Sequence, residues 1–154
     1  MSLFNNGTKI TIKTFDNYYL STSNGQVSLI PETSNPRPEE IIWTVSANIT
    51  DSAIPQAIYN LSQPDANGNN VYLDGLTGSG AVHLTNSIAS PYTGAYWAIS
   101  PVGEGGAGGI LLLCQGNVSG FQLLNGGGAT GTISLVSSVS PTGSSTIFNF
   151  EVVN

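Results

Sequence analysis

The sequence repeats one short pattern three times, as Ile41-Ile42-Trp43-Thr44-Val45, Ala95-Tyr96-Trp97-Ala98-Ile99 and Phe148-Asn149-Phe150-Glu151-Val152. Trp97 follows Trp43 by 54 residues and Phe150 follows Trp97 by 53, which is too regular to come from composition alone. A fixed period of this length is the signature of a repeat architecture. We therefore expect three copies of one unit, in which Trp43, Trp97 and Phe150 occupy equivalent buried places.

Each copy also contains two short apolar runs joined by a Gly-rich turn. The pairs are Tyr19-Leu20-Ser21 with Val27-Ser28-Leu29, Tyr72-Leu73-Asp74 with Val82-His83-Leu84, and Gln122-Leu123-Leu124 with Ile133-Ser134-Leu135. A further run opens each copy, at residues 9–14, 56–62 and 109–114. These runs alternate or are β-branched, and turn dipeptides such as Asn24-Gly25 bound them, which is typical of β-hairpins.

Three units of four strands predict an all-β fold, the β-trefoil, rather than a propeller, because propellers typically need about four to eight blades. We expect three four-stranded repeats of about 53 residues that close a barrel with pseudo-three-fold symmetry and so remove exposed sheet edges. The expected organisation is a single domain over residues 1–154, with repeats at about 8–50, 55–103 and 108–154.

The composition excludes several classes of partner. Only three residues are basic against nine acidic ones, which gives a formal net charge of −6. No basic patch can therefore neutralise nucleic-acid phosphates or an anionic bilayer. The single Cys114 lies in an apolar run and predicts a buried small side chain. The sequence shows no signal peptide and no long apolar run, so we expect a cytoplasmic protein without membrane insertion.

The second copy carries the best resemblance to a known family. Its residues Val71-Tyr72-Leu73-Asp74, Val82-His83-Leu84 and Tyr96-Trp97-Ala98-Ile99 resemble the repeat of ricin B-chain-like β-trefoil lectins, especially small fungal members without a signal peptide. Ile41, Ala95 and Phe148 stand where the family has a closing Gln. The resemblance implies a non-catalytic, carbohydrate-binding protein whose partners are glycans or glycoproteins, and it implies a homodimer.

The predicted carbohydrate site lies in the second copy. If the recurrent leucines pair as Leu20 with Leu29, Leu73 with Leu84 and Leu123 with Leu135, the next outward positions are also paired. Ser21 then lies opposite Ser28, Asp74 opposite His83, and Leu124 opposite Ser134. Only the second pair joins an exposed carboxylate to an imidazole, and both groups hydrogen-bond sugar hydroxyls. Three further residues are expected to form the wall of the site, namely Asn86, Tyr92 and Gly94.

Catalysis and metal binding are not expected. The only histidine is His83, no nucleophile elbow accompanies it, and one His and one Cys with scattered acids do not make a metal site. We therefore predict no enzyme activity, no cofactor and no metal.

Two alternatives stay open. A β-trefoil protease inhibitor would present the proline-rich loop 31–40, which contains Arg37 between Pro36 and Pro38. A fascin-like cytoskeletal binding module is suggested by the first hairpin, although a net charge of −6 opposes association with acidic filaments.

Overall fold

The computed structural model describes residues 4–48, 58–76, 79–88, 94–104, 107–115, 122–127, 131–137 and 144–154. Within them twelve strands form one antiparallel sheet, which confirms the predicted all-β class. Four strands fall in each expected repeat range. They are β1 (Thr8–Lys13), β2 (Tyr18–Ser23), β3 (Gln26–Pro31) and β4 (Ile42–Asn48); β5 (Ile58–Pro64), β6 (Asn70–Leu76), β7 (Ala81–Thr85) and β8 (Trp97–Pro101); and β9 (Ile110–Cys114), β10 (Leu123–Gly127), β11 (Thr132–Val136) and β12 (Asn149–Val152).

The helical segments described are short. They are the four-residue helix α1 (Pro38–Ile41) and the 3-10 turns η1 (Glu32–Ser34) and η3 (Ser144–Thr146). Pro38 opens α1, where its missing N–H costs no hydrogen bond. Helix α1 contacts β2 and β5, so it joins the first repeat to the second.

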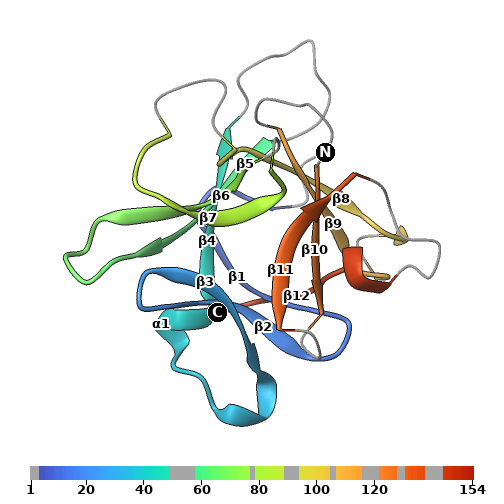
Figure 1. The fold of residues 1–154 in the computed structure, drawn as a ribbon, viewed down its shortest axis with the longest axis horizontal. Helices are drawn as coiled ribbons and strands as arrows, with labels where there is room; N and C mark the ends of the chain where they lie inside the picture. Colours follow the sequence, from blue (N-terminus) through green and yellow to red (C-terminus); the bar gives the residue numbers. More distant parts are fainter. Residues whose placement is uncertain are drawn as a thin grey trace.

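The sheet is arranged around three hairpins, β2–β3, β6–β7 and β10–β11, which lie around the middle of Figure 1 in blue, green and orange. Strands β3, β7 and β11 contact one another. The first and last strands of neighbouring repeats also pair, as β4 with β5, β8 with β9 and β12 with β1. Between β9 and β12 the described residues share only the isolated bridge Ile110 to Phe148. The ladders therefore do not show the closed barrel that the sequence predicts.

The aromatic anchors of the three repeats are Trp43, Trp97 and Phe148. Each pairs with the first strand of its own repeat, opposite Ile10, Tyr59 and Ile110 respectively. All three anchors are fully buried. The prediction that Phe150 is the third anchor is wrong, because Phe150 lies two residues further on, is only partly buried, and pairs with Ile12 of the first repeat. The even spacing of 53 residues pointed to the wrong member of the Phe148-Asn149-Phe150 triplet.

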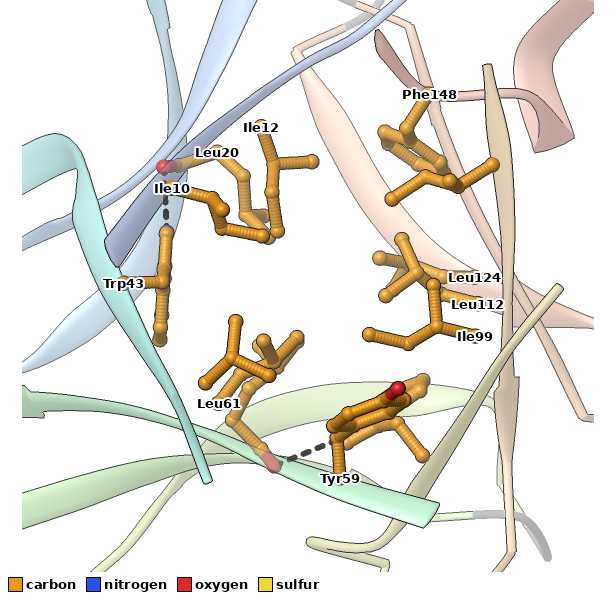
Figure 2. Packing of buried hydrophobic residues seen from close by; sticks show 14 of the residues in the cluster. Ile10, Ile12, Leu20, Trp43, Tyr59, Leu61, Ile99, Leu112, Leu124 and Phe148 are labelled. Carbon is orange, nitrogen blue, oxygen red and sulfur yellow. Dashed lines mark hydrogen bonds between the residues drawn. The ribbon is translucent and has the colours of Figure 1, made fainter. Parts of the chain in front are cut away.

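Each tryptophan anchor donates one hydrogen bond to the hairpin of its own repeat. The indole N–H of Trp43 donates to the carbonyl of Leu20 at 3.0 Å, and that of Trp97 donates to the carbonyl of Leu73 at 2.9 Å. Figure 2 shows the first of these bonds, with Phe148 and Leu124 on the other side of the view. The indole thus fills the core while its polar atom is satisfied, which is what burial of tryptophan requires.

The third hairpin has a different register from the predicted one. Leu124, not Leu123, pairs with Leu135, so Asn125 and not Leu124 lies opposite Ser134. Leu124 is fully buried and is the equivalent of Leu20 and Leu73. The first two predicted registers, Leu20 with Leu29 and Leu73 with Leu84, are confirmed.

Glycine recurs two residues after the hairpin leucine, as Gly75 after Leu73 and Gly126 after Leu124, because little space is left there. A Cβ on Gly75 would lie 2.9 Å from Leu135 and 3.0 Å from the sulfur of Cys114, and a Cβ on Gly126 would lie 2.8 Å from Ile133. In the first repeat Thr22 stands at this place, and its hydroxyl donates to the side chain of Gln63 at 2.5 Å. A side chain at Gly75 or Gly126 would therefore have to displace neighbouring core side chains.

The core itself is one cluster of buried apolar side chains from all three repeats. Cys114 is buried in it, as predicted, and its thiol is directed at the carbonyl of Gly94 at 3.3 Å. The inner sides of β3, β7 and β11 cover the cluster with partly buried side chains such as Val27, Val82 and Ile133.

The reassigned third anchor can be tested with a matched pair of substitutions. We expect Phe148→Ala to destabilise the protein by roughly 3–5 kcal/mol, because it empties a fully buried aromatic site. Phe150→Ala should cost clearly less, since Phe150 is partly exposed and its ring contact with Phe4 lies at the margin of the cluster. Urea unfolding of the two variants measures both costs. Equal losses, or a larger loss for Phe150→Ala, would contradict the assignment.

One buried polar atom has no partner among the described residues, the hydroxyl of Thr146. An unsatisfied buried hydroxyl carries a desolvation penalty of about 1–3 kcal/mol. We therefore expect Thr146→Val to raise the free energy of unfolding by up to that amount. Thr14 is the matched control, because it is equally buried but accepts a hydrogen bond from the Tyr18 N–H and donates one to Asp16. Thr14→Val should therefore destabilise, and the same sign for both variants in urea unfolding would refute the argument.

Candidate functional site

The candidate site is centred on one rung of the β6–β7 hairpin, where Asp74 pairs with His83 as the sequence predicts. Leu73 and Leu84 on the neighbouring rung face the core, so Asp74 and His83 face away from it. The Nε2 atom of His83 forms a hydrogen bond with the Oδ2 atom of Asp74. The two side chains are therefore in direct contact and act as one unit.

The two partners differ in exposure. The side chain of His83 is 46% exposed, whereas that of Asp74 is only 8% exposed. The expectation that Asp74 is an exposed carboxylate is therefore wrong. The segment before β8 lies directly beside β6 here, since the Gly75 N–H donates to the carbonyl of Gly94 at 3.0 Å. Of the two paired side chains, the imidazole is therefore the one that reaches solvent.

The burial of Asp74 changes its protonation. Desolvation raises the pKa of Asp74 above its ordinary value of 3.8, and the charge and hydrogen bond of His83 oppose that rise. Because His83 uses Nε2 to contact the carboxylate, its Nδ1 atom is the nitrogen left for a ligand. A neutral imidazole that donates through Nε2 accepts at Nδ1, and a protonated one donates there.

Gly94 has a packing role. It is buried, and a Cβ added to it would lie 1.7 Å from the carbonyl oxygen of Gly75. Its carbonyl accepts from the Gly75 N–H and from the thiol of Cys114. Gly94 thus holds the segment before β8 against the hairpin, and the structure gives it no surface with which to form a wall of the site.

The other two predicted wall residues are Asn86 and Tyr92. Asn86 is exposed and lies one residue beyond the end of β7, three residues from His83. Tyr92 lies outside the described residues. A sugar-stacking role for Tyr92 therefore stays a prediction.

Sequence reasoning missed Tyr72 as a site residue. Tyr72 lies two residues before Asp74 in β6 and pairs with Thr85, so its side chain is on the same face as Asp74 and His83. Tyr72 is partly exposed. The hairpin pattern identifies Tyr72 only as a strand residue, although the alternation of β6 around the inward Leu73 places it outward beside Asp74.

The equivalent rungs of the other repeats carry neutral pairs. Ser21 and Ser28 pair in the first repeat, and their hydroxyls lie 2.9 Å apart with Ser21 fully buried. Asn125 and Ser134 pair in the third repeat. Among the three rungs, the second is therefore the one that presents an imidazole held by a carboxylate.

The loop proposed for protease inhibition is partly helical. Arg37 is 72% exposed at its side chain, but its guanidinium donates to the Glu40 carboxylate at 2.6 and 3.0 Å. The hydrogen bond with Glu40 raises the pKa of Arg37 above its ordinary value. Helix α1 begins directly after Arg37. The arginine is thus directed back at its own loop.

The part of the chain that the structure describes contains no group of three or more His, Cys, Asp or Glu side chains placed to hold a metal ion. None of its helices is long and apolar enough to cross a membrane.

Comparison with known proteins gives a structural likeness and no sequence family. No protein-family model matches the chain, and no curated protein matches it in sequence. Among solved structures, the crystal structure of Cry35Ab1 superposes on 98% of the chain with a TM-score of 0.67 and 18% sequence identity. The match covers 37% of the Cry35Ab1 chain, so the present chain is similar to little more than a third of that protein. At this identity the likeness concerns the fold alone.

The raised pKa of Asp74 predicts how the stability depends on pH. A carboxyl that is more easily protonated in the folded state stabilises the fold most below its unfolded pKa, and this contribution is lost as the pH rises through its folded pKa. The stability of the natural protein relative to Asp74→Asn, which cannot titrate, should therefore fall as the pH rises from below 3.8. Urea unfolding of both proteins between about pH 3 and pH 5 measures this difference. A difference that rises with pH would contradict the effect of burial.

Proposed function

We propose that this protein is a non-catalytic, carbohydrate-binding β-trefoil whose primary site lies in the second repeat. The trefoil assignment is supported by three repeats that share one set of contacts, in which the anchors Trp43, Trp97 and Phe148 pair at equivalent places in their first strands. The mutual contacts of β3, β7 and β11 are those expected around a pseudo-three-fold axis. The bridge between Ile110 and Phe148 lies where β9 and β12 would meet to close the barrel.

The observation that carries the function is the half-exposed imidazole of His83, held by the buried carboxylate of Asp74. In this proposal His83 contacts the sugar through Nδ1, and Asp74 is a positioning residue that fixes the ring. A fixed ring loses little conformational freedom on binding, which lowers the cost of association. Direct acceptance of a sugar hydroxyl by Asp74, as the sequence suggested, does not fit a side chain that is 8% exposed.

Tyr72 supplies the second element that a sugar site needs. The apolar face of a pyranose ring packs well on an aromatic ring, while a few polar groups fix its orientation. Tyr72 is on the same face as His83 and one rung away, because it pairs with Thr85 while Asp74 pairs with His83. In this proposal Tyr72 contacts the ring of the sugar and the Asn86 amide binds a further hydroxyl.

The absence of catalysis is part of the proposal and is supported by residue counts. The chain has one histidine, and its Nε2 atom is already bonded to Asp74. Hydrolysis of a glycosidic bond usually needs two carboxyl groups that flank it. In the described structure the carboxyl group of this rung is one buried Asp74, so the pair suits binding and not bond cleavage.

The protease-inhibitor alternative has less support. An inhibitor needs an exposed, extended loop whose arginine is free to enter a specificity pocket. Arg37 is instead bonded to Glu40 and followed at once by a helix. We therefore keep glycans and glycoproteins as the proposed partners, with a homodimer as the proposed way to present more than one site.

The proposal predicts that the protein binds one or more neutral glycans on an array and that His83→Ala and Tyr72→Ala each weaken that binding. Loss of the hydrogen bond from His83 should cost roughly 1 kcal/mol or more, which is about a fivefold or larger rise in Kd by isothermal titration calorimetry. Tyr72→Phe should bind nearly normally, because it keeps the ring. Ser134→Ala in the third repeat is the matched control.

A clear result against the proposal would be the absence of any glycan bound by the folded natural protein. If a glycan binds but its Kd is the same in His83→Ala, Tyr72→Ala and the Ser134→Ala control, the protein is a lectin whose site lies elsewhere.

A further inference from the structure

A groove of about 960 Å³ is lined by residues of the first and second repeats. Its walls come from the β2–β3 turn at residues 22–25, the loop around Arg37 and Glu40, the β5–β6 turn at residues 64–67, and the end of β7 at residues 84–86. Ligand sites typically enclose about 300–1,000 Å³. This groove is therefore at the upper end of the range, and it has room for a ligand longer than one sugar residue.

The charged groups that line the groove are satisfied within the protein. The Glu40 carboxylate accepts two hydrogen bonds from Arg37, and the Oδ1 atom of Asp65 accepts from the N–H groups of Asn67 at 2.8 Å and Asn69 at 2.9 Å. The guanidinium of Arg37 also lies 3.7 Å from Glu39. Because these charges already have partners, they give the groove little means of selecting a ligand by its charge.

The polar groups left for a ligand are neutral amides. Asn24, Asn67 and Asn86 line the groove from three different segments, and all three are exposed. No hydrogen bond within the described residues uses one of their side-chain amides. Each amide offers two donors and one acceptor, which is a good match for hydroxyl groups that both donate and accept.

The turns that carry two of these amides have fixed backbones. Asn24 is in the left-handed conformation, with φ at 53°, in the tight turn between β2 and β3. Asn67 is fixed by its N–H bond to Asp65. Because the backbone at both positions is already ordered, a ligand would need to order only the amide side chains.

The floor of the groove is apolar, and its edge borders the proposed sugar site. Val71 and Leu84 are partly buried and supply the floor, which is on the face of the hairpin opposite to His83. Thr85, on the same face of β7 as His83 and about 6.6 Å further along the strand, lies at the edge of the groove. One ligand can therefore contact His83 and still extend past Thr85 towards Asn86.

We propose that this groove binds the further residues of a neutral oligosaccharide whose first residue is held at His83 and Tyr72. This inference rests on the proposed carbohydrate-binding function and specifies it: the ligand is an extended, uncharged glycan and not a single terminal sugar. The amides of Asn24 and Asn67 bind the hydroxyls of the second and later residues. In this proposal the ligand passes over Thr85 at the end of β7, so both repeats contribute to its binding.

The test measures affinity against glycan length. The probes are β-linked N-acetylglucosamine oligomers and galactose-ended neutral oligosaccharides, each of one to four residues, titrated into the full chain by calorimetry. We expect Kd for the preferred series to fall by about tenfold or more between one and three residues. The groove variant combines Asn24→Gly, which keeps the left-handed turn without strain, with Asn67→Ala. Asn149→Ala, an exposed asparagine of β12 outside the groove, is the control.

The groove variant should bind the single sugar as the natural protein does but lose the gain with length, while His83→Ala weakens binding at every length. If the natural protein binds glycans with a Kd that does not depend on length, or if the groove variant keeps the full gain, the groove proposal is wrong and the lectin proposal survives. If no probe and no array glycan binds, both proposals fail. A folded groove variant is verified by an unchanged urea midpoint.

Discussion

The hydrogen bond from each buried indole to the carbonyl of a hairpin leucine is the interaction on which the rest of the structure depends. It joins the last strand of a repeat to the hairpin that precedes it, from Trp43 to Leu20 and from Trp97 to Leu73. In both repeats the leucine that supplies the carbonyl is itself fully buried beside the indole. Once Leu73 faces inward, Asp74 must face the other way, and Tyr72 with it. The candidate site is therefore a consequence of how the core is packed.

The sequence predicted the features that depend on local patterns. The strand pattern, the Leu73 to Leu84 register and the Asp74 to His83 pair all follow from spacing within one hairpin, and the structure has them. The third hairpin was predicted one residue out of register because Leu123 and Leu124 are adjacent, and either could pair with Leu135. The match of Leu124-Asn125-Gly126 to Leu73-Asp74-Gly75 was the signal that would have separated them.

The features that sequence reasoning placed wrongly depend on contacts between distant segments. The segment carrying Gly94 is hydrogen-bonded to β6 directly after the buried Asp74, and no pattern within β6 predicts that contact. Phe148 is the third anchor because it pairs with Ile110, whereas a count of residues between aromatics favours Phe150. In the same way, the groove is formed by four segments from two repeats, so no single stretch of sequence predicts it.

The close approach of Gly94 to Gly75 has a consequence for how a triplicated chain can diverge. No side chain fits at Gly94, since even a methyl group would overlap the carbonyl of Gly75. At the same distance before their anchors, the other repeats have Glu40 and Ser145. The three units, although built on one plan, are therefore no longer interchangeable: a segment copied from the first or third unit into the second would not fit. The second repeat, which carries His83, is the one that does not accept a side chain at this position. A protein in which the order of the repeats is rearranged would have to keep Gly75 and Gly94 together.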